Sequence, residues 1–322
     1  MNALDHSVYS IEKTMRSVLL GLLFISSMAT AQDAAIPFEI ERLQDYPKTD
    51  AALNENLADM TADELLLAFH AEYKSIRADK PSEYFPKLSD LQKEIKILIE
   101  SNYPSHPANS LVRFLEEGCT KENLENLISQ PAEIKVLLPY QFMAAFALED
   151  TKREQVYIEA MLREGMLSDV LKDWGVTVLR SAAGFESIMT NGMQDLLAVR
   201  YAQLIKSMNP DIMVANKLVQ KCALSDEASS FGDMWFAPTL EKNMLDPFSS
   251  RLKIVGVGFA FQVPADGDRM KTIARAIPES SSQTPADRGL VSSYSYLQKG
   301  LEEAGNQMEA EELKKRIDKE GL

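Results

Sequence analysis

The residues best suited to chemistry in this chain gather around two points near its middle. Each point follows a stretch that we expect to be a β-strand, and its side chains are hydroxyls, amides and one carboxylate, beside a glycine. Such groups can hold a polar ligand, and a carboxylate can also act as an acid or a base. The candidate ligand-binding residues are therefore Thr190, Asn191, Gly192, Gln194, Asp195 and Asn216, with Lys217 beside the last of them.

A strand, a helix and a second strand must position these candidates. The residue patterns predict strands over 185–191 and 211–219 and a helix over 192–208. This order predicts a parallel strand pair joined by a right-handed crossover. Ligands of open parallel sheets bind beyond the carboxyl ends of the strands, which is where the candidates lie. A structural alternative stays open, because these residue types also suit a plain turn and the amino terminus of a helix.

Further strands complete a small sheet. Trp235 and Phe236 fit a short strand, and the apolar residues 252–261 predict one long strand. Gly256 and Gly258 lie inside that stretch and open no helix, so they predict close backbone packing or a bulge and not a dinucleotide-binding loop. The predicted fold class is α/β and mostly helical, with a small, mostly parallel sheet and flanking helices.

Helices dominate both ends of the mature chain. Residues 61–64, Thr-Ala-Asp-Glu, form a capping box that begins one helix, and apolar residues at spacings of three and four predict several more. Two short helices after residue 290 form a hairpin that resembles one tetratricopeptide unit, and a generic helical hairpin is the alternative. We expect a helical array over 32–166, an α/β unit over 167–278, and a linker with the helical hairpin over 279–322.

The first 31 residues are typical of a secretory signal peptide. Arg16 precedes an apolar run over 18–25, and the small residues Ala29-Thr30-Ala31 predict cleavage before Gln32. The run is far shorter than the roughly 20 residues that span a bilayer, which argues against a membrane anchor. Residues 1–14 place acidic groups ahead of the basic residue, and we interpret them as an over-called start. These features predict an exported, soluble protein, periplasmic or extracellular, with no stable membrane insertion after signal cleavage.

The composition excludes several functional classes. The chain has 45% hydrophobic residues, which suffices for a buried core, and its net charge of -14 opposes binding to nucleic acid. We find no serine nucleophile motif and no phosphate-binding loop in the sequence, and its histidines and cysteines have no short-spaced metal-binding pattern. We predict no catalytic residues, no metal and no cofactor. Cys119 and Cys222 are candidates for a disulfide in an exported protein, and two buried thiols are the alternative.

One stretch of the chain resembles a known protein family. Its matching residues are Trp174-Gly175, Thr190-Asn191-Gly192, Tyr201, Gln203 and Pro210-Asp211-Ile212-Met213-Val214-Ala215-Asn216. At this spacing they are similar to the soluble carboxy-terminal region of bacterial multi-pass membrane proteins that resemble protein O-mannosyltransferases, and the likeness extends over residues 140–322. The resemblance implies the α/β fold. The family pattern continues after the glycine with two acidic residues and a threonine, whereas this chain has Met193, Asp195 and Leu196, so the resemblance implies that a charged or metallic ligand of that loop is lost or altered here.

These features predict an exported, non-enzymatic binding or scaffold protein of the cell envelope with a protein or peptide partner, because helical arrays present extended grooves to polypeptides. Two other interpretations stay open: a carbohydrate-handling or enzymatic domain that acts at the loop Thr190–Asp195, and a structural remnant of the larger family architecture. The binding interpretation predicts a concave apolar or charged groove on the helices. The enzymatic interpretation predicts that Asp195 meets a second acid, a histidine or a lysine in a pocket.

Overall fold

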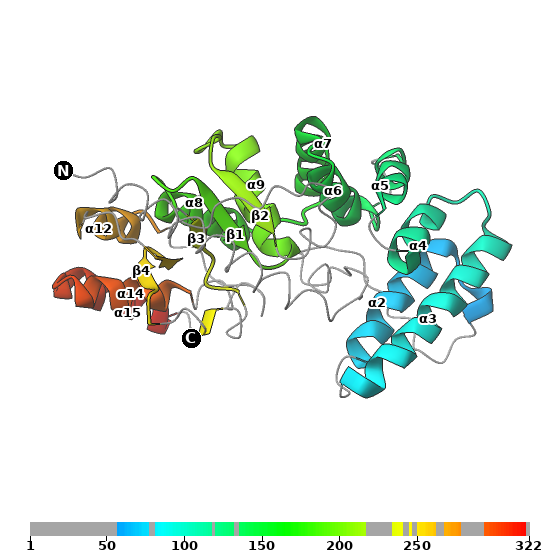
Figure 1. The fold of residues 1–322 in the computed structure, drawn as a ribbon, viewed down its shortest axis with the longest axis horizontal. Helices are drawn as coiled ribbons and strands as arrows, with labels where there is room; N and C mark the ends of the chain where they lie inside the picture. Colours follow the sequence, from blue (N-terminus) through cyan, green and yellow to red (C-terminus); the bar gives the residue numbers. More distant parts are fainter. Residues whose placement is uncertain are drawn as a thin grey trace, which may run out of the picture.

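The structure, a computed structural model, is mostly helical and elongated, with a small sheet between two groups of helices (Figure 1). It describes residues 57–76, 81–117, 120–131, 135–216, 234–240, 245–246, 250–261, 267–277 and 293–319. The predicted signal peptide, both cysteines and Lys217 lie outside these residues. Among the helices within these ranges, none combines the length and the hydropathy that a membrane span requires.

The amino-terminal helices form the array that the sequence predicts (Figure 1, blue to green). The capping box is confirmed, because the Thr61 amide donates to Glu64 Oε2 at 2.7 Å and the Glu64 amide donates to Thr61 Oγ1 at 3.3 Å. Their apolar faces pack into one continuous core. The elements are the 3-10 helix η2 (Leu57–Asp59) and the helices α2 (Ala62–Ile76), α3 (Pro81–Asn102), α4 (Ala108–Glu117), α5 (Lys121–Ile128), α6 (Leu138–Ala147) and α7 (Thr151–Arg163).

The strand–helix–strand unit is confirmed with shorter strands than the sequence predicts. Helix α8 (Asp169–Ser181) leads into β1 (Ser187–Thr190), which is followed by α9 (Met193–Leu204) and β2 (Met213–Asn216). β1 and β2 are parallel, with Ser187 opposite Met213. Gly175 on α8 allows the two helices to touch, because a Cβ there would lie 2.1 Å from the carbonyl oxygen of Ala198 on α9.

The sheet is mixed and has the strand order β2-β1-β3-β5-β4. β3 (Met234–Phe236) is parallel to β1, whereas β5 (Gly258–Ala260) is antiparallel to both β3 and β4 (Lys253–Val255). The prediction of one long strand over 252–261 is therefore wrong. Gly256 adopts a φ of +64° and makes a two-residue turn with Val257, and such a turn folds the stretch into a hairpin.

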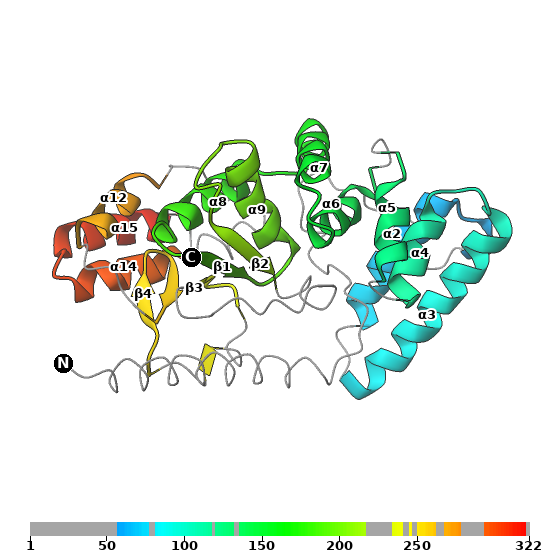
Figure 2. The ribbon, with the colours of Figure 1, turned by 45° about the horizontal axis from the view of Figure 1, so that its top comes forward.

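Different groups of side chains pack against the two faces of the sheet. On the first face, Ile188 and Trp235 belong to the core that α8 and α9 share with the rest of the molecule. Figure 2 shows α8 and α9 on one side of the strands. On the second face, the strand register aligns one apolar residue from every strand, because side chains alternate between faces along a strand. We call this set the apolar row: Ala215, Met189, Phe236, Phe259 and Ile254.

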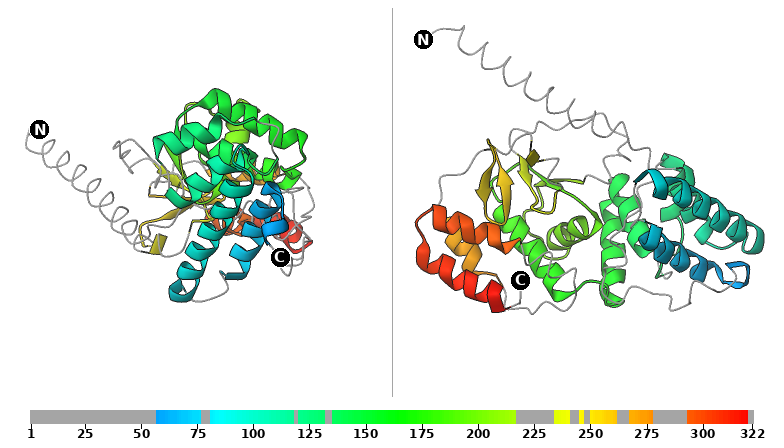
Figure 3. Two further views of the ribbon diagram at one scale, coloured as in Figure 1. Left: turned by 90° about the vertical axis from the view of Figure 1, so that its right-hand side faces the viewer. Right: turned by 90° about the horizontal axis from the view of Figure 1, so that it is seen from below.

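Three carboxy-terminal helices close the β4 end of the sheet, as Figure 3 shows. They are α12 (Gly267–Arg275), α14 (Tyr294–Glu303) and α15 (Gln307–Lys319), and the last two form the predicted hairpin, which turns at Gly305 with a φ of +77°. Arginine side chains bind carbonyl oxygens at the ends of neighbouring helices. Arg269 donates to the carbonyl oxygen of Ser181 at 2.6 Å, and Arg180 donates to that of Ala276 at 3.2 Å.

A buried ion pair joins the helical array to the α/β unit. Arg200 on α9 donates to both carboxylate oxygens of Glu154 on α7, from Nε at 2.7 Å and from Nη2 at 3.0 Å. Arg200 also donates to Gln203 Oε1 at 2.7 Å, and Gln203 donates to the carbonyl oxygen of Ile212 at 2.8 Å. A continuous chain of hydrogen bonds therefore runs from α7 through α9 to the segment that precedes β2.

The buried hydroxyl of Tyr294 makes the fold less stable at alkaline pH. Burial raises the pKa of Tyr294 to about 12, and a hydrogen bond with Thr177 opposes this only in part. Below the ordinary tyrosine pKa of 10.0, the hydroxyl keeps its proton in both the folded and the unfolded chain. The contribution of Tyr294 to stability is therefore complete at those pH values. As the pH rises from that value through the folded-state pKa, the unfolded chain releases its proton first, and we expect a loss of roughly 3 kcal/mol. The variant Tyr294→Phe removes this component. Its stability relative to the wild type should therefore rise between about pH 9 and about pH 12 in urea unfolding, and an unchanged difference would contradict the assignment.

Candidate functional site

The structure brings the predicted loop residues together at the carboxyl ends of β1 and β2. The Thr190 hydroxyl donates to the carbonyl oxygen of Ala215 at 3.0 Å. The Asn216 amide donates to Thr190 Oγ1 and to the carbonyl oxygen of Gly192, each at 2.8 Å. Thr190 and Asn216 are almost completely buried. Their side chains therefore tie the two strand ends to the start of α9.

Asp195 and Asn191 extend this network to the segment that follows β3. The Thr239 hydroxyl and the Asn191 backbone amide both donate to Asp195 Oδ2, the latter at 3.3 Å. The Asn191 side-chain amide donates to the carbonyl oxygen of Thr239 at 2.9 Å. Thr239 is thus held through both its hydroxyl and its backbone, and it lies between Pro238 and Leu240.

The geometry of this network favours the structural interpretation of the loop. Asp195 is 3% exposed, and Gln194 on the same first turn of α9 is 6% exposed. The hydrogen-bond donors to Asp195 include the Thr239 hydroxyl and the Asn191 backbone amide, which are typical of a structural carboxylate. The polar groups of the loop hold backbone segments at fixed positions.

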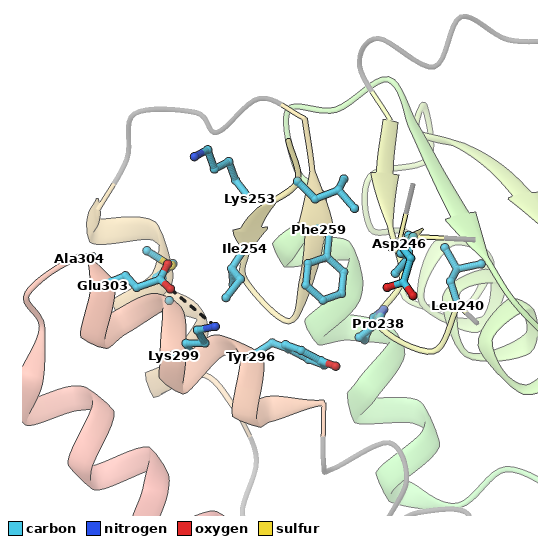
Figure 4. A pocket seen from close by; sticks show the side chains of 14 residues that line it. Pro238, Leu240, Asp246, Lys253, Ile254, Phe259, Tyr296, Lys299, Glu303 and Ala304 are labelled. Atoms are coloured by element: carbon cyan, nitrogen blue, oxygen red, sulfur yellow. Dashed lines mark ion pairs between the residues drawn. The ribbon is translucent and has the colours of Figure 1, made fainter. Parts of the chain in front are cut away.

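A cavity lies on the second face of the sheet, beside the segment that Thr239 anchors. It has a volume of about 730 Å³, within the range of roughly 300–1,000 Å³ that is usual for ligand sites. Its residues come from β4 and β5, from α12 and α14, and from the chain around positions 238–246. We call it the sheet–hairpin cavity, because it lies between the sheet and the first helix of the carboxy-terminal hairpin (Figure 4).

The interior of the sheet–hairpin cavity is mostly apolar. Two members of the apolar row, Ile254 and Phe259, form the wall on the sheet side. Phe259 packs edge-to-face against Tyr296 of α14, with ring centroids 4.9 Å apart. Gly300 permits the close approach of α14, because a Cβ there would lie 2.9 Å from Met270 Sδ and 3.1 Å from Ile254 Cγ2. Leu240 and Pro238 line the cavity from the segment after β3.

Charged groups lie at the rim of the sheet–hairpin cavity. Lys299 and Glu303, one helical turn apart on α14, form an ion pair at 4.0 Å, and both side chains are mostly exposed. Asp246 lines the cavity from the segment after β3. In Figure 4, the carboxylates of Glu303 and Asp246 lie at opposite ends of the space between α14 and the sheet. Lys253 also lines the cavity, but pleat alternation directs its side chain toward the opposite face of the sheet from Ile254.

The two polar regions are connected through the chain. The bonds from Asp195 and Asn191 fix Thr239, and its neighbours Pro238 and Leu240 form one wall of the cavity. The predicted candidates therefore support a cavity that sequence patterns alone did not indicate. A two-residue turn at Gly256-Val257 is the one local signal that could have revealed it, because the turn places Ile254 beside Phe259.

The other candidates from the sequence are possible metal ligands and the two cysteines. In the part of the chain that the structure describes, no three His, Cys, Asp or Glu side chains are grouped so that they could hold a metal ion. The predicted disulfide partners Cys119 and Cys222 lie outside it. His106 is described: its Nδ1 accepts a hydrogen bond from the Ala108 amide at 3.1 Å and caps the start of α4.

Comparisons with known proteins give no relative for this chain. A scan against protein-family models found no match, and neither curated proteins nor solved structures gave a significant one. The sequence resemblance to the mannosyltransferase-like membrane proteins and to a tetratricopeptide unit therefore stays a prediction.

Proposed function

We propose that this protein is an exported, non-enzymatic binding or scaffold protein of the cell envelope, and that it binds its partner at the sheet–hairpin cavity. The observation that carries the proposal is the cavity of about 730 Å³, which has an apolar interior and a charged rim. An apolar pocket with a few polar groups is the usual form of a binding site. Export rests on the signal-like residues 1–31.

The bonding of the loop supports binding over catalysis. The side chains of Thr190, Asn191 and Asn216 each bond backbone groups of other segments, so they stabilise the architecture around the cavity. The groups that face the cavity are aliphatic, aromatic or solvent-exposed charges. Such groups supply shape and charge complementarity, and they are seldom the acids and nucleophiles of an active site.

Blocking the cavity should abolish capture of the partner. Ala304 lines the cavity at the exposed end of α14, so Ala304→Trp fills the cavity mouth with little effect on the core. Met308, which is 74% exposed and is absent from the cavity lining, provides the control Met308→Ala on the same hairpin. We expect the mature chain from Gln32 to capture a partner from cell-envelope extract after cross-linking. Capture should fall at least about tenfold for Ala304→Trp, as for loss of a central anchor, and stay unchanged for Met308→Ala.

Two results would count against the proposal. Equal capture by wild type and Ala304→Trp would place the partner elsewhere on the surface. Chemical conversion of a captured small molecule by the wild type would show an enzyme. Urea unfolding of both variants provides the check on folding, because Ala304 and Met308 are exposed and their substitution should change stability by less than about 0.5 kcal/mol.

A further inference from the structure

We infer that the buried ion pair between Glu154 and Arg200 is an orientation lock, which fixes the angle between the helical array and the α/β unit. This inference concerns a conformational device of the fold and goes beyond the proposed binding function. The observations that carry it are the place of the pair at one end of α7, the elements that Arg200 contacts, and the directional geometry of its bonds.

Helix α7 is attached to the α/β unit at both of its ends. At its carboxyl end, residues 164–168 lead directly into α8, and Gly165 there adopts a φ of +71°. At its amino end, Glu154 in the first turn binds Arg200 on α9. These two attachments lie about 15 Å apart along the helix axis. A helix that is held at one end can pivot about that end, and a second attachment at this distance prevents the pivot.

Arg200 connects the last two helices of the array to the sheet. Its guanidinium binds both carboxylate oxygens of Glu154 on α7 and lies 5.6 Å from the ring centroid of Phe146 on α6. Its Nη1 donates to Gln203, which donates to the carbonyl oxygen of Ile212 just before β2. Figure 1 shows α6 and α7 between the rest of the array and α9, so an angle that is fixed at this joint extends to the whole array.

The geometry of the pair resists sliding more strongly than apolar packing does. Hydrophobic burial is non-directional, so two apolar helix faces can shift with little change in buried area. A guanidinium and a carboxylate that share two parallel hydrogen bonds must keep one relative geometry. The Glu154 side chain is 1% exposed, so a rotation of α7 that separates the two groups would leave a charge in a dry interior. The pair therefore selects one orientation where an apolar pair would allow several.

The test measures the distribution of distances between the two ends of the mature chain. Ile97 on α3 is 64% exposed and Met308 on α15 is 74% exposed, and these helices lie at opposite ends of the molecule (Figure 1). Nitroxide labels attached to p-acetylphenylalanine at these two positions leave the native cysteines unmodified. Double electron–electron resonance then gives the width of the distance distribution and the number of populations in it.

Three variants separate orientation from stability. Glu154→Met with Arg200→Met removes the directional bonds and keeps side chains of similar length. We expect this double variant to fold, with a distance distribution at least about twofold wider than that of the wild type. Arg200→Lys keeps the charge and loses the two-pronged geometry, so its distribution should have an intermediate width. Arg153→Met is the control on α7, because its ion pair is largely exposed, and it should keep the wild-type width.

A folded double variant with the wild-type width would overturn the inference, because apolar packing alone would then set the angle. Equal widening by the control Arg153→Met would overturn it too, since the effect would not belong to the buried pair. If urea unfolding shows that the double variant does not fold, Arg200→Lys decides: a wider distribution supports the lock, and the wild-type width refutes it. The proposed binding function is tested separately by Ala304→Trp, which leaves this joint intact.

Discussion

Replacing Arg200 with methionine lowers the free energy of unfolding by about 4 kcal/mol, because the change leaves the carboxylate of Glu154 buried without its cation. The Glu154 side chain is 1% exposed and that of Arg200 is 13% exposed, so water cannot take the place of the guanidinium. The same substitution breaks the hydrogen bond from Arg200 to Gln203. Urea unfolding measures the loss directly as a change in the midpoint.

The double variant Glu154→Met with Arg200→Met separates the cost of an orphaned charge from the value of the pair. Replacing both partners of a buried ion pair with apolar residues is often neutral or stabilising. We therefore expect the double variant to be more stable than Arg200→Met alone. Arg153→Met on the same helix α7 is the control, because its ion pair with Asp150 is largely exposed and contributes little. A double variant as unstable as the single one would show that the pair itself stabilises the joint between the array and the α/β unit.

The pH dependence of Arg200→Met follows from the state of Glu154. Burial already raises the pKa of Glu154, and the hydrogen bond and charge of Arg200 only partly oppose this. Removing Arg200 raises that pKa further, so the folded variant binds a proton that the unfolded chain releases at lower pH. Stability is then present at low pH and lost as the pH rises through the folded-state pKa. The penalty of Arg200→Met should therefore shrink as the pH falls through the folded-state pKa of Glu154 in the variant toward the ordinary value of 4.5, and a constant penalty would refute this explanation.

Much of this fold can be predicted from local signals in the sequence. The capping box at 61–64 and the strand–helix–strand order around α9 are visible because caps, turns and apolar periodicity act over a few residues. Local signals fail at residues 252–261, where apolar residues continue through the turn. The positive φ of Gly256 and the contact of Gly258 with Trp235 depend on a strand that lies about 20 positions earlier in the sequence.

The candidate site shows the same limit. The sequence identifies the polar residues at the strand ends, since their types and positions are local properties. It does not identify their partner Thr239, and it does not identify the cavity, whose walls come from Leu240, Phe259 and Tyr296 in separate elements. Tertiary packing alone brings these residues together, so side-chain periodicity carries no sign of it.

Replacing Asp195 with alanine lowers the free energy of unfolding by about 3 to 5 kcal/mol. The buried carboxylate accepts hydrogen bonds from the Thr239 hydroxyl and the Asn191 backbone amide. Hydrogen bonds to charged groups contribute about 1.5 to 3 kcal/mol each. Asp195→Asn keeps one acceptor oxygen and should recover part of the loss. Asp211→Ala removes an exposed carboxylate just before β2 and should change stability by less than about 0.5 kcal/mol. Urea unfolding of the three variants gives the comparison.

The effect of Asp195→Ala on binding decides between the two interpretations of the loop. If the carboxylate only holds Thr239, the variant should capture the partner from cell-envelope extract several-fold less, because the wall formed by Pro238 and Leu240 loses its anchor. The matched change Thr239→Val should then lower capture to a similar degree. A variant with wild-type stability that has lost a small-molecule ligand would instead place a ligand on Asp195 itself. That result would make the carbohydrate-handling interpretation of the loop the stronger one, since a carboxylate whose removal costs no stability is free to serve a ligand.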